Sequence, residues 1–260
     1  SGILNITTRK IYWETKRGCS FACGFCEWGN AQIGMIELDE NHIQKDIEFF
    51  KNSNVDEINI LDGTFNSKND YQKILLQLIN NTDAKITFQA RFEILTNEFL
   101  KFCSEYKERL HLEFGLQTIH KKEMEIIGRT NNMNIISTRI DELNQYEIDY
   151  EVSIIYAIPE QTVESFIDTI EFLRVHKCKK IKAYPLQVPR NSELEHKKQE
   201  YQITFQKEKY NVQTVSSSIS FQKENRKDMD NIADMLNVDN PYFLLVEDHN
   251  KQKIKTSQFQ

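Results

Sequence analysis

The chain has 260 residues, of which 39% are hydrophobic and 28% are charged, with eight glycines and four prolines. This composition is typical of one globular domain with an ordinary buried core, and it excludes a disordered or fibrous chain. The 33 basic and 39 acidic residues give a net charge of -6, which disfavours a nucleic-acid partner, and no apolar run reaches the roughly 20 residues that a membrane helix needs. The N-terminal residues lack the basic start and apolar stretch of a secretory signal, so we expect a cytoplasmic protein.

Short runs rich in β-branched and aromatic residues alternate with longer amphipathic stretches along most of the chain. Such runs are typical of buried parallel strands, and the stretches between them are typical of connecting helices. The predicted strands cover residues 11–15, 57–61, 85–89, 111–116, 151–156 and 180–186. The predicted helices cover residues 41–50, 71–79, 97–106, 134–146 and 163–176, and Thr96 and Thr162 stand as N-caps before two of them.

Repeated strand–helix units of this kind form a parallel sheet with right-handed crossovers. Six units, where a complete barrel has eight, predict an α/β fold that is a partial (β/α)6 TIM-type barrel, open on one side. After about Pro189 the pattern loosens through residues 197–220, and a helix-like stretch returns at residues 226–236. We therefore predict a barrel core over residues 8–190 and a small C-terminal extension over residues 191–260.

Three of the five cysteines lie close together, directly after the first predicted strand. They are Cys19, Cys23 and Cys26, and Gly18 and Gly24 give this loop the backbone freedom to wrap around a shared centre. An odd number of cysteines with this clustering indicates metal binding in a reducing compartment rather than disulfide bonds. Three thiolates on a 4Fe-4S cluster leave one iron without a protein ligand, and an open iron is a place for chemistry.

A structural zinc site is the alternative interpretation of the same loop. It needs a fourth ligand, for which His42 or a distant cysteine is available. Structural zinc sites usually combine two closely spaced pairs of cysteine or histidine, and a second pair is missing here, so the spacing favours the iron–sulfur cluster. Cys103 and Cys178 are isolated in sequence, and we interpret both as small buried hydrophobic residues.

The cysteine spacing, with the aromatic Phe25 just before the last cysteine, resembles the radical S-adenosylmethionine (SAM) superfamily. The resemblance covers about residues 8–190. Within this range, the segments that carry it are residues 12–29, 61–66, 112–117, 127–129 and 154–162. These segments look like the branch that contains the cobalamin-dependent enzymes, the Elongator-type and methylthiotransferase enzymes, and the oxygen-independent coproporphyrinogen dehydrogenases. A fainter similarity to cobalamin-type members continues through residues 194–236.

The resemblance implies a 4Fe-4S cluster and SAM as cofactors. In this superfamily SAM binds the open iron, and its reductive cleavage gives methionine and a 5′-deoxyadenosyl radical that takes hydrogen from a substrate. The protein orients the reactants and excludes water, for which the C-terminal mouth of a barrel is suited. The resemblance further implies a flavodoxin or ferredoxin as electron donor, and a small molecule or a peptide as substrate.

The resemblance also implies roles for individual residues. Cys19, Cys23 and Cys26 would ligate the cluster. The expected SAM contacts are Phe25 near the adenine, the backbone of Asp62, Gly63 and Thr64 near the amino group, Glu93, Gln117 and Arg129 on the ribose and the methionyl carboxylate, and Ser153, Ile155 and Ala157 of the fifth strand. An arginine fits the carboxylate because its planar fork can form two parallel hydrogen bonds. The competing interpretation of the three polar residues 93, 117 and 129 is that they lie on the surface or on the barrel rim.

Two positions depart from the family pattern. Ser153 stands where related enzymes often have aspartate, and Ala157 stands where they often have glycine. A serine hydroxyl can still contact the ribose, but it carries no charge. These departures raise the alternative of a SAM- or iron-responsive binding protein that has lost turnover.

The reaction stays open at the level of sequence. Our leading hypothesis is hydrogen abstraction from a small molecule or peptide in a biosynthetic pathway. Cobalamin-type members carry a cobalamin-binding domain ahead of the barrel, and too few residues precede Ile11 to form one. The alternative is therefore a C-methyltransferase core that works with a separate cobalamin domain. RNA modification in the manner of the methylthiotransferases is disfavoured, because a second cysteine triad and a basic appended domain are missing.

Overall fold

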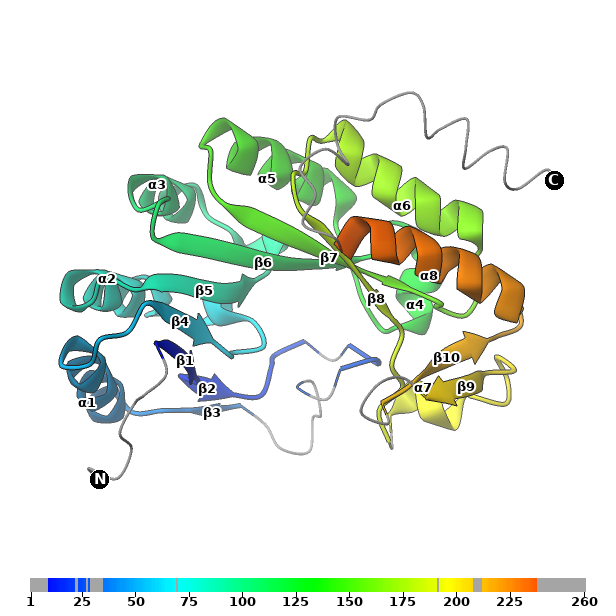
Figure 1. The fold of residues 1–260 in the computed structure, drawn as a ribbon, viewed down its shortest axis with the longest axis horizontal. Helices are drawn as coiled ribbons and strands as arrows, with labels where there is room; N and C mark the ends of the chain where they lie inside the picture. Colours follow the sequence, from blue (N-terminus) through cyan, green and yellow to red (C-terminus); the bar gives the residue numbers. More distant parts are fainter. Residues whose placement is uncertain are drawn as a thin grey trace.

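The computed structural model describes residues 9–21, 23–26, 28, 35–68, 70–190, 192–207 and 212–237. Within them, six parallel strands form one curved sheet in the order β1-β4-β5-β6-β7-β8 (Figure 1). The strands are β1 (Lys10–Trp13), β4 (Glu57–Ile60), β5 (Lys85–Ala90), β6 (Leu110–Gln117), β7 (Tyr150–Tyr156) and β8 (Ile181–Pro185). Each corresponds to a strand predicted from the sequence. Because β1 and β8 are the two edges, the sheet does not close, and the prediction of a partial barrel is confirmed.

Helices connect the strands and pack around the outside of the sheet (Figure 1). They are α1 (Glu40–Lys51), α2 (Tyr71–Asn81), α3 (Asn97–Glu105), the short α4 (Lys121–Ile126), α5 (Met133–Gln145) and α6 (Val163–Val175). The predicted caps are present, because the side chains of Thr96 and Thr162 accept hydrogen bonds from the amides of Phe99 and Ser165. Sequence reasoning missed only the shortest of these helices, α4, which lies between β6 and α5.

The two faces of the sheet differ in polarity, which determines where a ligand can bind. Along β6, Leu110, Leu112 and Phe114 are buried between the sheet and its helices. The alternate residues His111 and Glu113 are half-buried on the opposite, concave face. Successive strand residues point to opposite faces, so the helix-covered side forms the apolar core and the concave side forms a polar hollow.

The region after β8 is more ordered than its sequence pattern indicates. It contains α7 (Glu193–His196), a hairpin of β9 (Thr204–Lys207) and β10 (Gln213–Ser217), and α8 (Lys223–Asn237). At the end of α8, Asn237 Oδ1 accepts a 2.9 Å hydrogen bond from the backbone N–H of Ala183, and Asn237 Nδ2 donates a 2.8 Å hydrogen bond to the carbonyl of Ala183. The helix α8 therefore covers part of the edge strand β8. The fully buried Arg226 joins α8 to β10 through the carbonyl of Val215. The boundary at residue 191 stays a prediction.

Candidate functional site

A cavity of about 160 Å³ lies at the C-terminal ends of the strands, where ligands bind in open parallel sheets. We call it the cysteine cavity, because Cys19, Cys23 and Cys26 line one side of it together with Phe25 and Trp28. The facing wall belongs to the ends of β4 to β7 and to the segments that follow them. From the residues expected to contact SAM, this wall contains Gly63, Thr64, Gln117, Arg129 and Ser153.

Two segments of the barrel contact the cysteine loop directly. The amide of Gly24 donates a 2.8 Å hydrogen bond to the carbonyl of Ile127, which follows α4. The sulfur of Cys19 lies 3.5 Å from the hydroxyl of Thr64, after β4. The short antiparallel pair of β2 (Lys16–Arg17) and β3 (Ile36–Glu37) borders the loop in sequence. The loop is therefore attached to the segments that follow β4 and α4, which are distant from each other in sequence.

The cysteines fit a cluster with three protein ligands. None of the three forms a disulfide bond, and all are half-buried on the cavity wall. Among the described residues, the one group of three potential metal ligands whose atoms all lie within 4.8 Å of one another is formed by His111, Glu113 and Glu151. The three cysteine sulfurs therefore do not all lie within 4.8 Å of one another. They are thus spread more widely than the about 3.8 Å that follows from tetrahedral zinc–sulfur bonds. His42 hydrogen-bonds to Asp39 at the start of α1 and does not lie on the cavity wall, so it offers no fourth zinc ligand.

Arg129 provides a positive charge on the cavity wall. Its Nη1 donates to the sulfur of Cys23 at 3.8 Å, its Nε donates to Asn131 Oδ1 at 3.0 Å, and its Nη2 donates to the carbonyl of Gly115. Burial lowers the pKa of Arg129 below its usual 12.5, but a guanidinium stays charged at neutral pH. Three of its five N–H groups are used by the protein, so the fork is held in place while capacity remains for a ligand carboxylate.

Gln117 reaches the cavity through an irregular backbone. The pairing of β6 with β7 shifts register between Gly115 and Gln117, and Gln117 has a φ of 71°, which is uncommon for a residue other than glycine. A side chain at position 115 would overlap the amide of Gln117. The glycine and the bulge together allow Gln117 to lie on the same wall as Arg129 and Ser153. Backbone irregularities of this kind concentrate at functional sites.

Four expected contacts lie off the cavity wall. The carboxylate of Asp62 is buried and accepts hydrogen bonds from the amide and hydroxyl of Thr15 at 2.8 and 2.5 Å, which anchors the chain ahead of the cysteines. Glu93 lines an adjoining cavity, where it pairs with Arg91 at 3.1 Å. Ile155 and Ala157 are 7% and 0% exposed. A SAM contact by Asp62, Ile155 or Ala157 would have to use the backbone.

Three polar wall residues were missed by sequence reasoning, namely Gln89, Arg91 and Glu113. The guanidinium of Arg91 lies 3.9 Å from the ring centroid of Phe21 in the cysteine loop and donates to the carbonyl of Thr130 at 2.6 Å. Strand alternation carries a signal for Gln89 and Glu113, because both fall on the polar phase of predicted strands. Arg91 directly follows β5, where a ligand-binding position is expected in a parallel sheet.

Comparison with known families identifies the family of this chain. The sequence model of the Radical SAM superfamily matches residues 13–173, which is more than half of the chain. The chain belongs to the radical SAM superfamily. The members of this superfamily are enzymes that use a 4Fe-4S cluster and SAM, so the expected superfamily and the expected cofactors are confirmed. The assignment of Cys19, Cys23 and Cys26 as the cluster ligands stays a prediction.

Individual relatives point to the cobalamin-dependent branch. The chain is 25% identical over 199 residues to the cobalamin-dependent radical SAM methyltransferase TokK from Streptomyces tokunonensis, covering 70% of this chain and 29% of TokK. It is 39% identical over 54 residues to 2-(S-pantetheinyl)-carbapenam-3-carboxylate methyltransferase from Streptantibioticus cattleyicolor, covering 20% of this chain and 8% of that protein. The chain thus spans less than a third of the length of either relative.

Solved structures show the same fold. The radical SAM methyltransferase TsrM from Kitasatospora setae, with cobalamin and a 4Fe-4S cluster bound, aligns with a TM-score of 0.60 at 12% identity, covering 70% of this chain and 38% of TsrM. SuiB from Streptococcus suis, bound to SAM, aligns with a TM-score of 0.58 at 15% identity, covering 70% of this chain and 42% of SuiB. Among the described residues, no helix has the length and apolar character to cross a membrane.

Proposed function

We propose that this chain is the catalytic core of a radical SAM enzyme in which Cys19, Cys23 and Cys26 bind the 4Fe-4S cluster. The observation that carries the proposal is that three half-buried cysteines, none of them in a disulfide bond, line one cavity at the C-terminal ends of a parallel sheet. When bound, the cluster supplies one electron that cleaves SAM to methionine and a 5′-deoxyadenosyl radical, which abstracts hydrogen from the substrate.

The other wall residues orient SAM in this proposal. Arg129 binds the methionyl carboxylate, because its guanidinium is already fixed by Gly115 and Asn131. Gln117 and Ser153 offer neutral hydrogen-bonding groups to the ribose, and Phe25 offers an apolar ring to the adenine. With the reactants enclosed between the loop and the sheet, these residues keep water and stray hydrogen donors away from the radical.

The substrate in this proposal is a small molecule or a peptide of a biosynthetic pathway, and a flavodoxin or ferredoxin delivers the electron. The fold accommodates peptides in at least one structural neighbour, since SuiB has been solved with the precursor peptide SuiA at a TM-score of 0.56. The net charge of -6 agrees with a substrate other than nucleic acid.

A second candidate is methyl transfer with cobalamin supplied from outside this barrel. It is favoured by the similarity to TokK, the carbapenam methyltransferase and TsrM, each of which is described as a methyltransferase. A methyltransferase that uses SAM as methyl donor forms S-adenosylhomocysteine, whereas reductive cleavage forms 5′-deoxyadenosine. Both products are measured in one chromatographic assay, with and without added cobalamin.

The test is anaerobic reconstitution with iron and sulfide, followed by SAM and dithionite. We expect release of 5′-deoxyadenosine by the wild-type protein and by Cys103→Ala, whose cysteine is buried away from the cavity. Cys26→Ala should lose both the cluster and the product. If the wild-type protein binds SAM but forms neither 5′-deoxyadenosine nor S-adenosylhomocysteine, the proposal is wrong and the chain is a SAM-responsive binding protein.

A further inference from the structure

The concave face of the sheet holds a second cavity, nearer the N-terminal ends of the strands. This barrel cavity has a volume of about 640 Å³, and its wall includes Lys10, Glu57, His111 and Glu151. Glu113 lines both the barrel cavity and the cysteine cavity. Its carboxylate therefore lies at the boundary between the proposed place of radical formation and the interior of the barrel.

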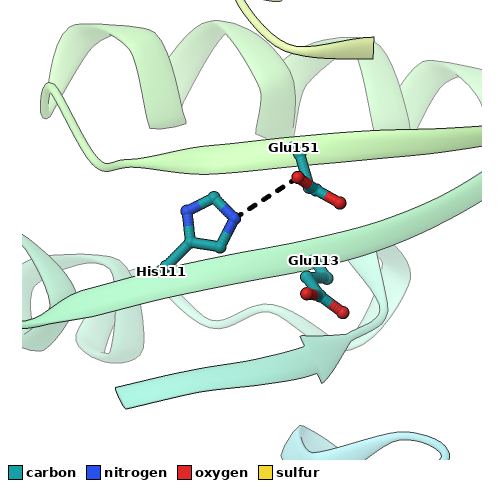
Figure 2. A group of neighbouring side chains, drawn as sticks. All are labelled: His111, Glu113 and Glu151. Carbon is teal, nitrogen blue, oxygen red and sulfur yellow. Dashed lines mark ion pairs between the residues drawn. The ribbon is translucent and has the colours of Figure 1, made fainter. Parts of the chain in front are cut away.

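Glu113 belongs to a cluster of charged side chains. Figure 2 shows His111 and Glu113 on β6 and Glu151 on the neighbouring β7. The potential ligand atoms of these three side chains all lie within 4.8 Å of one another. His111 lies 3.6 Å from Glu151 and 2.8 Å from Asp149. The ammonium of Lys180 lies 2.9 Å from Glu151.

These ion pairs disfavour a metal ion in the cluster. Burial lowers the pKa of His111, but its hydrogen bonds with Asp149 and Glu151 raise it more, to about 9, so both ring nitrogens carry protons at neutral pH. Burial raises the pKa of Glu151, but His111 and Lys180 lower it more, to about 2. A metal ion would have to remove the His111 proton and displace Lys180 from Glu151.

Glu113 is the carboxylate of this cluster that has no ion-pair partner among the described residues. Within the described residues it forms no ion pair, whereas Glu151 pairs with Lys180 and Asp149 pairs with His111. Burial and the nearby charge of Glu151 raise the pKa of Glu113. The charges of His111 and Lys180 and a hydrogen bond with the side chain of Gln89 lower it by less, so the net shift is upward. A partly desolvated carboxylate of this kind is stabilised when a cation binds to it.

We propose that Glu113 binds a positively charged amino group of the substrate, so that the enzyme acts on an organic amine. Gln89 on β5 is paired with Glu113 on β6, and Ser153 on β7 lies on the wall of the cysteine cavity. The side-chain oxygens of Gln89 and Ser153 can both accept further hydrogen bonds from an ammonium group. This inference rests on the proposed function, because it takes the cysteine cavity as the place of reaction.

Binding of n-butylammonium to the reconstituted protein with SAM tests the proposal, measured by saturation-transfer NMR. We expect 1-butanol to bind at least tenfold more weakly than n-butylammonium. Glu113→Gln should weaken the binding of n-butylammonium at least tenfold. Glu113→Asp, which keeps the negative charge, should weaken this binding less. Glu57→Gln is the matched control, because Glu57 lines the barrel cavity but not the cysteine cavity, and its carboxylate pairs with Lys10 at 2.9 Å.

Equal binding of n-butylammonium by wild-type protein and a folded Glu113→Gln variant would overturn the proposal. So would a Glu113→Gln variant that loses affinity for SAM and keeps its affinity for the amine, or a wild-type protein that binds Mn²⁺ through Glu113 in electron paramagnetic resonance titrations. Failure of the proposed function gives a different result, namely intact amine binding without any cleavage of SAM.

Discussion

The guanidinium of Arg129 lies 3.8 Å from the sulfur of Cys23, which is 106 residues away in sequence. Two residues earlier, the carbonyl of Ile127 accepts the amide of Gly24. The segment after α4 thus contacts the middle of the cysteine loop through both a side chain and the backbone. The geometry of the cysteine loop consequently depends on the folding of β6 and α4.

Replacement of Arg129 tests its role toward SAM. Arg129→Gln removes the cation from the wall, so we expect the dissociation constant of SAM to rise at least tenfold, since charge-assisted hydrogen bonds contribute about 1.5–3 kcal/mol. Lys121→Gln, at an exposed position, should leave the constant unchanged. Isothermal titration on reconstituted protein gives the constant, and iron content shows whether the cluster is retained. Unchanged SAM affinity would exclude Arg129 from the SAM site.

Gly115 controls the position of Gln117. In Gly115→Ala the new methyl group would overlap the amide of Gln117 and lie 3.7 Å from Arg129 Nη2, so the Gln117 side chain must move. We expect weaker SAM binding with a small change in thermal stability. In a Gln117→Ala background the same glycine substitution should have little further effect, because the overlapping group is gone. Additive losses in this double-mutant cycle would show that the two residues act independently.

Periodicity and spacing were sufficient to predict the sheet and the cysteine loop, because strand alternation and clustered thiols are local signals. The wall opposite the cysteines was harder to predict. Arg91 and Gln89 lie there because β5 ends beside the cysteine loop, and that neighbourhood is set by sheet order. The hairpin of β9 and β10 was missed because its strands are short and carry no run of apolar residues.

The role of Asp62 differs from that of the wall residues. Its buried carboxylate accepts hydrogen bonds from Thr15 and from the amide of Lys16, so Asp62→Ala leaves these buried donors without their acceptor. We expect the free energy of unfolding to fall by about 1–3 kcal/mol. SAM affinity of the folded variant should change little, because the side chain lies off the cavity wall. Urea denaturation and SAM titration measure the two effects separately. Lost SAM affinity at unchanged stability would contradict this assignment.

The charged cluster of the barrel predicts a pH dependence of stability. The pKa of His111 is about 9 in the folded protein, above the ordinary 6.5, because its bonds to Asp149 and Glu151 outweigh burial. Its contribution is therefore complete below pH 6.5 and is lost as the pH rises through 9, by about 1–3 kcal/mol. Denaturation curves from pH 6 to 10, compared with those of His111→Gln, isolate this contribution. Parallel curves for the two proteins would refute it.

The central claim is that three cysteines hold a cluster with one iron open to SAM. Its most direct measurement is the low-temperature electron paramagnetic resonance spectrum of the reconstituted, dithionite-reduced protein before and after addition of SAM. We predict about four iron atoms per chain and a spectrum that changes when SAM is added, with both features lost in Cys26→Ala. Zinc bound in the cysteine loop, or an iron signal that SAM leaves unaltered, would contradict the account.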